Sequence, residues 1–282
     1  MAQGDLTAAH CKDQPVERMG APAKHALEGL SWIAAQEAAS RPGSTVIWPF
    51  GAVEQHGPHL PLGTDAIFAE RVLQAVLERL PAELPIWRLP LFQLGFSPEH
   101  GAFPGTLSLP AEVLLQVVMA VGADLARAGF QRLVLFNAHG GQIALLQVAA
   151  RQLRAAHPRL AVMPCFLWSG PPGVAALLPE PERSEGLHAA LAETSLMLHL
   201  APELVGPQRP REGQPDPAPP AGWSLEGAVP TAWLTADLSA SGVVGDARGA
   251  DAALGKALCT ALVDGWVTLL GDLLSSPWPP RP

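Results

Sequence analysis

The stretch STVIWPFGAVEQHGPHLPLGTD, residues 44–65, joins a strand, a polar loop and the start of a helix. Its first seven residues are mostly apolar and predict a short buried β-strand. The loop that follows is interrupted by glycine and proline and carries one glutamate and three potential histidine or aspartate ligands. Asp65 stands directly before AIFAERVLQAVLERL (66–80), whose apolar residues have helical spacing and predict an amphipathic helix. The stretch therefore indicates a βα unit with a polar loop at the carboxyl end of its strand.

The rest of the chain repeats this alternation. Further apolar runs predict strands at residues 86–92, 131–137 and 159–168, and apolar periodicity predicts helices at about 25–40, 109–129, 141–156, 187–201 and 247–275. Gly129 is expected to end its helix as a C-cap glycine. Strands alternating with helices predict α/β layering around a mainly parallel sheet. We expect one domain over residues 25–275.

Two segments are expected to lack regular structure. Residues 1–24 mix polar residues, glycine and proline without a period and are predicted to be poorly ordered. Residues 206–222 contain six prolines and little apolar material. They are interpreted as an extended loop inside the domain, because apolar patterning resumes after them.

Composition narrows the class of protein. The 282 residues are 48% hydrophobic and only 16% charged, with 26 acidic and 18 basic residues. The absence of a lysine or arginine run argues against nucleic-acid binding. Three scattered cysteines (Cys11, Cys165 and Cys259) indicate a reduced, cytoplasmic protein. The N-terminus is too polar for a secretory signal, and no apolar stretch near 18 residues lacks polar breaks, so no membrane span is expected.

Candidate metal ligands follow two of the predicted strands. Glu54 and His56 come after the strand at 44–50, and His139 follows the strand at 131–137. Sites in open α/β sheets form at the carboxyl ends of strands, so both loops are expected to meet at one edge. A carboxylate and an imidazole two residues apart are natural ligands for Zn²⁺, Mn²⁺ or Fe²⁺. Asp65 could bridge two ions, which is typical of a two-metal hydrolase.

Each of these residues also has a structural explanation. Asp65 could simply cap the helix that it precedes. His139 could be an ordinary hydrogen-bonding loop residue, and the glycines beside it could serve only the turn. Spacing by itself therefore leaves the metal site and these alternatives about equally supported.

Five segments, in order, resemble the motifs of the creatininase family. They are GAVEQHGPHLPLGTD (51–65), FSPEHGAFPGTLSL (96–109), FNAHGGQ (136–142), HAALAETSLMLHLAPELV (188–205) and SGVVGD (241–246). The resemblance covers roughly residues 25–260. It implies a single three-layer α/β/α domain, a binuclear metal centre, amidohydrolase chemistry and a homo-oligomer, commonly a hexamer. It also implies that Glu54, His56, Asp65 and His139 are ligands, with Asp65 bridging.

Two departures from the family pattern concern the site. Creatinine-opening relatives carry a ligand glutamate two residues after the histidine of the His139 turn, where this chain has Gly141. We expect Glu193 or a water to replace it, and activity on creatinine itself to be weak or absent. The family's usual H-A-G-E-x-E-T-S run reads H-A-A-L-A-E-T-S here, so that Leu191 replaces the first glutamate while Glu193 is retained.

Three residues are candidates for catalysis. His188 and His100 are the candidate proton carriers or oxyanion stabilisers, and Glu193 is a candidate for both catalysis and metal binding. His188 and Glu193 lie five residues apart, about 140° around an ideal helix. Either His188 therefore lies at the entrance of the helix, or only one of the two faces the site. For His100 a plain loop hydrogen bond is an equally good explanation.

The expected function is metal-dependent hydrolysis of an amide, cyclic amide or formamide bond in a small molecule. Two divalent ions per chain are expected, with zinc favoured and manganese or iron as alternatives. Some family members act in peptide maturation, so a metallopeptidase is a second possibility. Two rivals come from other classes: a metal-binding scaffold without catalysis, and a phosphate-binding protein that uses the turn at AHGGQ. The latter lacks the usual glycine-rich motifs.

Overall fold

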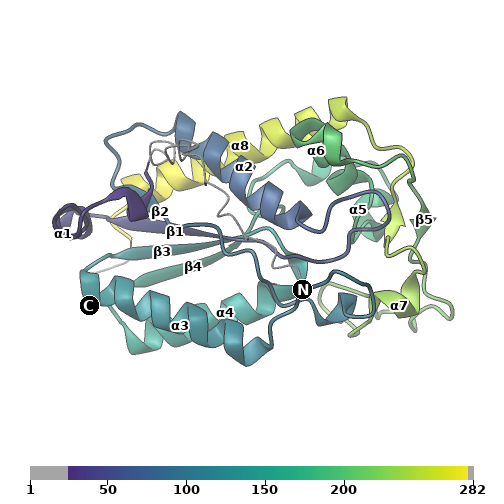
Figure 1. Ribbon diagram of the computed structural model, residues 1–282, viewed down its shortest axis with the longest axis horizontal. Helices are drawn as coiled ribbons and strands as arrows, with labels where there is room; N and C mark the ends of the chain where they lie inside the picture. Colours follow the sequence, from purple (N-terminus) through teal and green to yellow (C-terminus); the bar gives the residue numbers. More distant parts are fainter. Residues whose placement is uncertain (1–24, 279–282) are drawn as a thin grey trace, which may run out of the picture.

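A four-stranded parallel sheet lies at the centre of the computed structural model, which describes residues 25–278 (Figure 1). The segment 1–24 lies outside the described residues. The strand order is β2-β1-β3-β4, with all neighbours parallel. The strands are β1 (Thr45–Phe50), β2 (Ile86–Arg88), β3 (Arg132–Asn137) and β4 (Ala161–Phe166). Phe50 and Asn137 are partners at the ends of β1 and β3, so the loops after these two strands start side by side, as the sequence predicts.

Helices cover both faces of the sheet and make the fold a three-layer α/β/α domain (Figure 1). One layer holds α2 (Thr64–Arg79), α6 (Leu191–Leu200) and α8 (Ala252–Ser275); the other holds α3 (Ala111–Ala128) and α4 (Ile143–Ala156). Alternate residues of β3 serve the two layers. Leu133 and Leu135 pack in the core on the α3 and α4 side, whereas Val134 and Phe136 pack on the α2 and α8 side. A strand buried on both faces reads as a continuous apolar run.

Two predicted helices begin later than expected, because a capping side chain marks the start of each one. The helix predicted for residues 25–40 is α1 (Trp32–Ser40), and the side chain of Ser31 caps it by accepting a hydrogen bond from the backbone N–H of Ala34 at 3.2 Å. The helix predicted for 247–275 is α8, which begins at Ala252. The Asp251 carboxylate caps it by accepting hydrogen bonds from two backbone N–H groups of its first turn.

The helix predicted for residues 187–201 is also shorter. It is α6, which begins at Leu191, because Ala189 has a left-handed backbone with φ of 52° that no helix continues through. The strand predicted for 86–92 ends at Arg88, two residues before Pro90, which has no N–H for a ladder. Gly129 has φ of 101° and ends α3 as the predicted C-cap.

Short elements gather at the right-hand end of the molecule in Figure 1. They include α5 (Glu182–Glu185), α7 (Thr235–Leu238) and a two-stranded antiparallel sheet of β5 (Arg211–Glu212) and β6 (Gly245–Asp246). The predicted loop 206–222 is irregular apart from β5. Single 3-10 turns complete the described chain: η1 (Leu27–Gly29), η2 (Pro98–His100), η3 (Gly140–Gln142), η4 (Ala175–Leu177) and η5 (Pro202–Leu204).

The C-terminal helix α8 is long and apolar enough to cross a membrane, judged by length and composition. One such helix does not overturn the expectation of no membrane span, because the core helix of a globular domain meets the same criterion. Packing gives another reason for its composition: Leu258, Leu262 and Trp266 are buried in the core that α8 shares with α2 and α6. Lys256 and Asp264 lie on the exposed face of α8. This division is typical of an amphipathic core helix.

Candidate metal centre

The predicted ligands are delivered by the ends of β1 and β3 and by the start of α2. Glu54 and His56 lie in the loop after β1, His139 lies two residues after β3, and Asp65 is in the first turn of α2. Gly51 allows this arrangement. A Cβ on Gly51 would lie 2.6 Å from backbone atoms of Ala66, so only glycine lets the loop after β1 lie against the start of α2.

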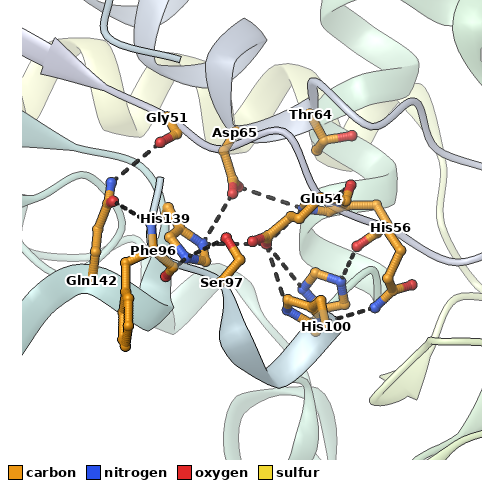
Figure 2. Close-up of polar contacts among 12 residues, drawn as sticks. Gly51, Glu54, His56, Thr64, Asp65, Phe96, Ser97, His100, His139 and Gln142 are labelled. Carbon is orange, nitrogen blue, oxygen red and sulfur yellow. Dashed lines mark hydrogen bonds and ion pairs between the residues drawn. The ribbon is translucent and has the colours of Figure 1, made fainter. Parts of the chain in front are cut away.

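These four side chains converge in a buried cluster (Figure 2). His139 Nδ1 lies 3.2 Å from Glu54 Oε1 and 3.2 Å from Asp65 Oδ2. His56 Nε2 lies 3.5 Å from Asp65 Oδ1 and 3.9 Å from Glu54 Oε1. None of the four residues is more than 2% exposed. Two carboxylates buried this closely need positive charge between or beside them.

Hydrogen bonds on the far side of each imidazole set which nitrogen faces the carboxylates. His139 Nε2 lies 2.9 Å from the Phe96 carbonyl, to which it donates, so Nδ1 of the neutral ring is a lone pair facing Glu54 and Asp65. His56 Nδ1 lies 3.2 Å from the Glu54 carbonyl and leaves Nε2 facing the same carboxylates. Lone pairs directed at carboxylate oxygens repel unless a cation or a proton lies between them.

Unpartnered atoms and pKa shifts indicate the same need for a cation. Glu54 Oε2, His56 Nε2 and Asp65 Oδ2 are buried and make no hydrogen bond with the described residues. Burial opposes the charged form of His56, but Asp65 and the other carboxylates outweigh it and raise the pKa to about 9. Glu54 and Asp65 likewise outweigh burial and raise the pKa of His139 well above its usual value. In the metal-free protein, protons take the place that a cation would hold.

Glu193 and His188 join the cluster from the start of α6. The Glu193 carboxylate accepts a hydrogen bond from the Ala189 backbone N–H at 2.7 Å, and the same oxygen lies 4.0 Å from His56 Nε2. His188 precedes α6, and its ring lies 4.3 Å from that of His56. His188 therefore lies at the helix entrance, which was one of the two arrangements that the spacing allowed. The left-handed backbone of Ala189 makes this possible.

The rings of His188 and His100 stack with centroids 4.1 Å apart but present different groups. His188 Nε2 donates to the Gln55 carbonyl at 2.7 Å, so its Nδ1 lone pair faces Glu54 Oε1 at 3.9 Å. His100 Nδ1 accepts from the Gln55 side-chain amide at 2.8 Å and lies 2.7 Å from the Thr235 hydroxyl. Its Nε2–H then points toward Glu54 Oε1 at 3.6 Å. His188 is thus a proton acceptor and His100 a donor.

The surroundings keep both of these rings neutral. Burial lowers the pKa of His100 to about 4, with Glu54 opposing that change. Burial, together with His56 and His100, lowers the pKa of His188 well below its usual value. The plain loop hydrogen bond considered for His100 exists, but on the side of the ring away from the cluster.

All seven predicted site residues are therefore brought together. Three overlapping groups of them hold ligand atoms within 4.8 Å of one another: Glu54, His56 and Asp65; Glu54, His100 and His188; and His56, His188 and Glu193.

Sequence reasoning missed residues that support or adjoin the cluster. Gln55 braces His100 and His188 and accepts a hydrogen bond from the Gly57 N–H. Gly242, in the quoted motif SGVVGD, makes room for it, because a Cβ there would lie 2.0 Å from Gln55 Oε1. Glu99 lines the same cavity as the cluster. Its position directly before His100 in a matched motif is a signal that could have identified it.

A cavity of about 540 Å³ adjoins the cluster. Its lining includes Glu54, Asp65, His139, His188 and Glu193 beside apolar side chains such as Trp168, Leu178 and Trp233. Among the described lining residues, none is lysine or arginine. A convergent polar cluster in a partly apolar cavity is typical of an active site.

Comparisons with known proteins identify the family of the chain. Residues 28–270 match the family described as "Creatininase: Creatinine amidohydrolase". The "Mycofactocin precursor peptide peptidase" of Mycobacterium tuberculosis (strain CDC 1551 / Oshkosh) is 36% identical over 245 residues, which cover 84% of this chain and 87% of that protein.

Two solved structures are similar over most of both chains. "Creatininase Mn" has a TM-score of 0.68 at 27% identity and covers 91% of this chain and 100% of its own. A mutant creatininase of the "Zn-Zn type" has a TM-score of 0.68 at 27% identity and covers 90% of this chain and 99% of its own. A family match over most of the length and a relative above 30% identity lead to one conclusion: the chain belongs to the creatininase family of hydrolases that act on carbon–nitrogen bonds.

Proposed function

We propose that the protein is a binuclear metal-dependent hydrolase that cleaves an amide bond. The observation that carries the proposal is the buried cluster of carboxylates and imidazoles whose unpartnered lone pairs face one another. Buried polar atoms of purely structural clusters have hydrogen-bond partners, whereas Glu54 Oε2, His56 Nε2 and Asp65 Oδ2 have none among the described residues. Likeness to solved creatininases named for manganese and for a Zn-Zn type supports the choice of metals.

The residues present fit two divalent ions. Glu54, His56, Asp65, His139 and Glu193 would hold them, with Asp65 shared because each of its oxygens faces a different histidine. Mixed nitrogen and carboxylate donors suit Zn²⁺, Mn²⁺ and Fe²⁺, of which zinc is favoured. When bound, such a pair supplies the Lewis acidity that activates water and polarises a carbonyl.

The other residues of the site handle protons and hold the ligands in place. His188 offers its Nδ1 lone pair inside the cavity, so we assign it the task of accepting a proton and returning it to the leaving nitrogen. His100 directs an N–H toward Glu54 across 3.6 Å. Burial raises the pKa of Glu193 to about 7, opposed most by His56, so without bound metal this carboxyl is partly protonated near neutral pH. Oxyanion stabilisation by His188 is disfavoured, because its N–H is engaged with Gln55.

A peptide is the favoured substrate, ahead of a small cyclic amide or a formamide. The cavity of about 540 Å³ is in the size range of pockets that take drug-sized ligands. It also continues from the cluster to the apolar side chains of Trp168 and Trp233, which could receive peptide side chains. Similarity to a precursor peptide peptidase supports this choice. We further propose that the enzyme acts in the cytoplasm as a homo-oligomer.

Two rivals fit the site less well. A phosphate-binding site at the AHGGQ turn would need positive charge, whereas the cavity lining at this turn includes Glu54, Asp65 and Glu99. A scaffold without catalysis would not require the acceptor and donor orientation of His188 and His100. Metal uptake without hydrolysis of any amide in a broad panel would favour the scaffold.

The proposal is tested by metal content and hydrolysis together. Protein purified without chelator should hold about two divalent ions per chain by elemental analysis. Asp65→Ala should reduce this below roughly one ion, because Asp65 contacts both halves of the cluster. Hydrolysis of a peptide panel should be lost in the same variant.

The matched control is Asp124→Ala, which removes an exposed carboxylate paired with Arg127 on α3. It should leave both metal content and hydrolysis unchanged. Full metal occupancy in Asp65→Ala would show that Asp65 does not bridge, and a wild-type protein that takes up no divalent ion would contradict the proposed function.

A further inference from the structure

The space beside Gly141 is occupied by the carboxylate of another residue. A Cβ on Gly141 would lie 2.1 Å from Glu99 Oε1, which is closer than real Cβ atoms approach any neighbour. The backbone of Gly141 has no left-handed conformation that would itself require glycine. The neighbouring Gly140 has nothing within 4 Å of a Cβ. Glycine at position 141 therefore leaves room for Glu99 rather than serving the turn.

Glu99 is held in this place by contacts on both sides of its loop. The Phe96 carbonyl accepts a hydrogen bond from His139 at 2.9 Å, which ties the start of the loop to the turn after β3. His100 is tied to Gln55 at 2.8 Å. Glu99 lies between these attachments in η2, half-buried. The backbone of the loop is thus anchored on both sides of Glu99.

The Glu99 carboxylate lies on the His139 side of the cluster. Glu99 lines the cavity together with Glu54, Asp65 and His139. The Cβ position on Gly141 that lies 2.1 Å from Glu99 Oε1 also lies 2.7 Å from His139 Nε2. A carboxylate and an imidazole therefore converge where a side chain at position 141 would stand. A third acid beside two buried carboxylates needs a cation, and the described lining holds no lysine or arginine.

We propose that Glu99 is a metal-binding residue, which supplies from the 96–100 loop the carboxylate that Gly141 does not carry. This inference rests on the proposed function, because it assigns a further residue to the same metal centre. It adds a candidate to the expectation that Glu193 or a water replaces the missing carboxylate. Glu193 enters the cluster from the α6 side, next to His56, whereas Glu99 enters beside His139.

The test is the affinity of the metal-stripped protein for Zn²⁺ and Mn²⁺, measured by calorimetry and chelator competition. Glu99→Gln keeps the shape and removes the charge, and it should weaken one of the two ions at least about 10-fold. Gly141→Ala introduces the Cβ that collides with Glu99 and should also weaken binding. In the double variant Gly141→Ala should cost less than it does alone, because the charge that it displaces is already gone.

Two controls accompany these variants. Gly140→Ala adds the same methyl group in open space one residue away, and Glu112→Gln removes an exposed acid in the first turn of α3. Both should bind metal like the wild type. Circular dichroism and thermal unfolding of the metal-free proteins verify that all variants are folded.

The outcomes separate the two levels of the proposal. Wild-type protein that binds no divalent ion contradicts the proposed function, and this assignment with it. Wild-type protein that binds two ions while Glu99→Gln binds them equally tightly contradicts only the role of Glu99. An undiminished effect of Gly141→Ala in the Glu99→Gln background would mean that the methyl group acts through His139, and would also overturn the assignment.

Discussion

At the residue scale, both departures from the family motifs are accompanied by a carboxylate from elsewhere in the chain. Glu99 fills the space beside Gly141. Glu182, from α5, meets the start of α6 close to Leu191, which stands where the family has its first glutamate. Its carboxylate accepts a hydrogen bond from the Ala192 backbone N–H at 2.9 Å. The charge that the motif lacks is thus provided at the same two places by other segments.

Glu182 should make stability depend on pH. Burial raises its pKa to about 7, partly offset by hydrogen bonds from the first turn of α6. The unfolded chain releases this proton near pH 4.5, so between pH 4.5 and 7 the folded state binds more protons and stability falls as pH rises. Glu182→Gln lacks this loss. From pH 4.5 to pH 7, its free energy of unfolding should therefore rise relative to that of the wild type by up to about 3 kcal/mol.

The measurement is urea unfolding of metal-free protein at pH values from 4.5 to 8. Glu203→Gln, on the exposed turn η5, is the matched control and should follow the wild type throughout. A constant difference between Glu182→Gln and the wild type at every pH would show that Glu182 titrates alike in the folded and unfolded chains.

At the residue scale, the sequence predicts the ligands whose positions depend on local rules. Glu54, His56 and His139 follow strand ends, and neighbouring parallel strands bring such loops together. It does not predict Glu99 or Glu182. Glu99 lies beside Gly141, and Glu182 accepts a hydrogen bond from the Ala192 backbone N–H. Both contacts join segments that only the fold brings together. Motif matching marks position 141 as lacking a carboxylate but cannot show which distant residue fills the space.

At the element scale, α6 and α8 cross in close contact and this crossing holds the α6 part of the site. A Cβ on Gly255 of α8 would lie 1.8 Å from the Ser195 carbonyl of α6. The two backbones therefore touch at this point. The close approach fixes the start of α6, with Glu193, against the cluster.

Gly255→Ala should consequently destabilise the protein. Overpacking of a rigid backbone contact costs about 1–3 kcal/mol or more, which corresponds to a fall in Tm of several degrees. Gly271→Ala in the same helix is the matched control, because a Cβ there meets nothing within 4 Å. It should be neutral or stabilise by up to about 1 kcal/mol. Equal thermal stability of the two variants would contradict the close crossing.

The sequence predicts elements better than their ends. Buried apolar runs identify β1, β3 and β4, and helical spacing identifies α2, α3 and α4, because both patterns follow from local geometry. The start of α6 escapes prediction. Residues 187–190 have the composition of a helix, but the left-handed Ala189 and the hydrogen bond from its N–H to Glu193 shape them instead. Tertiary contacts override propensity at this point.

At the scale of the whole molecule, the cavity has a charge that the composition only suggests. The formal net charge is −8, and every charged residue described in the cavity lining is an acid apart from the histidines. Two divalent ions would balance the four innermost carboxylates, of Glu54, Asp65, Glu99 and Glu193. Glu182 and Glu226 would remain as acidic groups farther along the wall. Above about pH 7, where Glu182 is ionised, parts of a substrate that lie beyond the reacting bond therefore meet negative charge.

This distribution predicts selectivity among substrates. Peptides with an amidated C-terminus should be hydrolysed with a kcat/KM at least about tenfold higher than the same peptides with a free carboxylate, a difference of about 1.4 kcal/mol. Added salt should reduce the ratio, because screening weakens the repulsion. Creatinine should be a poor substrate. The missing glutamate at position 141 does not explain this, because Glu99 occupies the space beside His139. The reason becomes the apolar part of the cavity, which creatinine leaves unfilled.

A variant links the selectivity to the wall of the cavity and not to the reacting centre. Glu226→Gln removes one of the two outer acids without touching the cluster, so it should lower the preference for the amidated peptide while leaving kcat for that peptide unchanged. Glu112→Gln removes an acid from the exposed surface of α3 and should leave the preference intact. If free carboxylate peptides are hydrolysed as fast as amidated ones at low salt, the acidic wall does not select the substrate. In that case the C-terminal carboxylate of the peptide would lie against the metal ions, and Glu226→Gln would leave hydrolysis of that peptide unaltered.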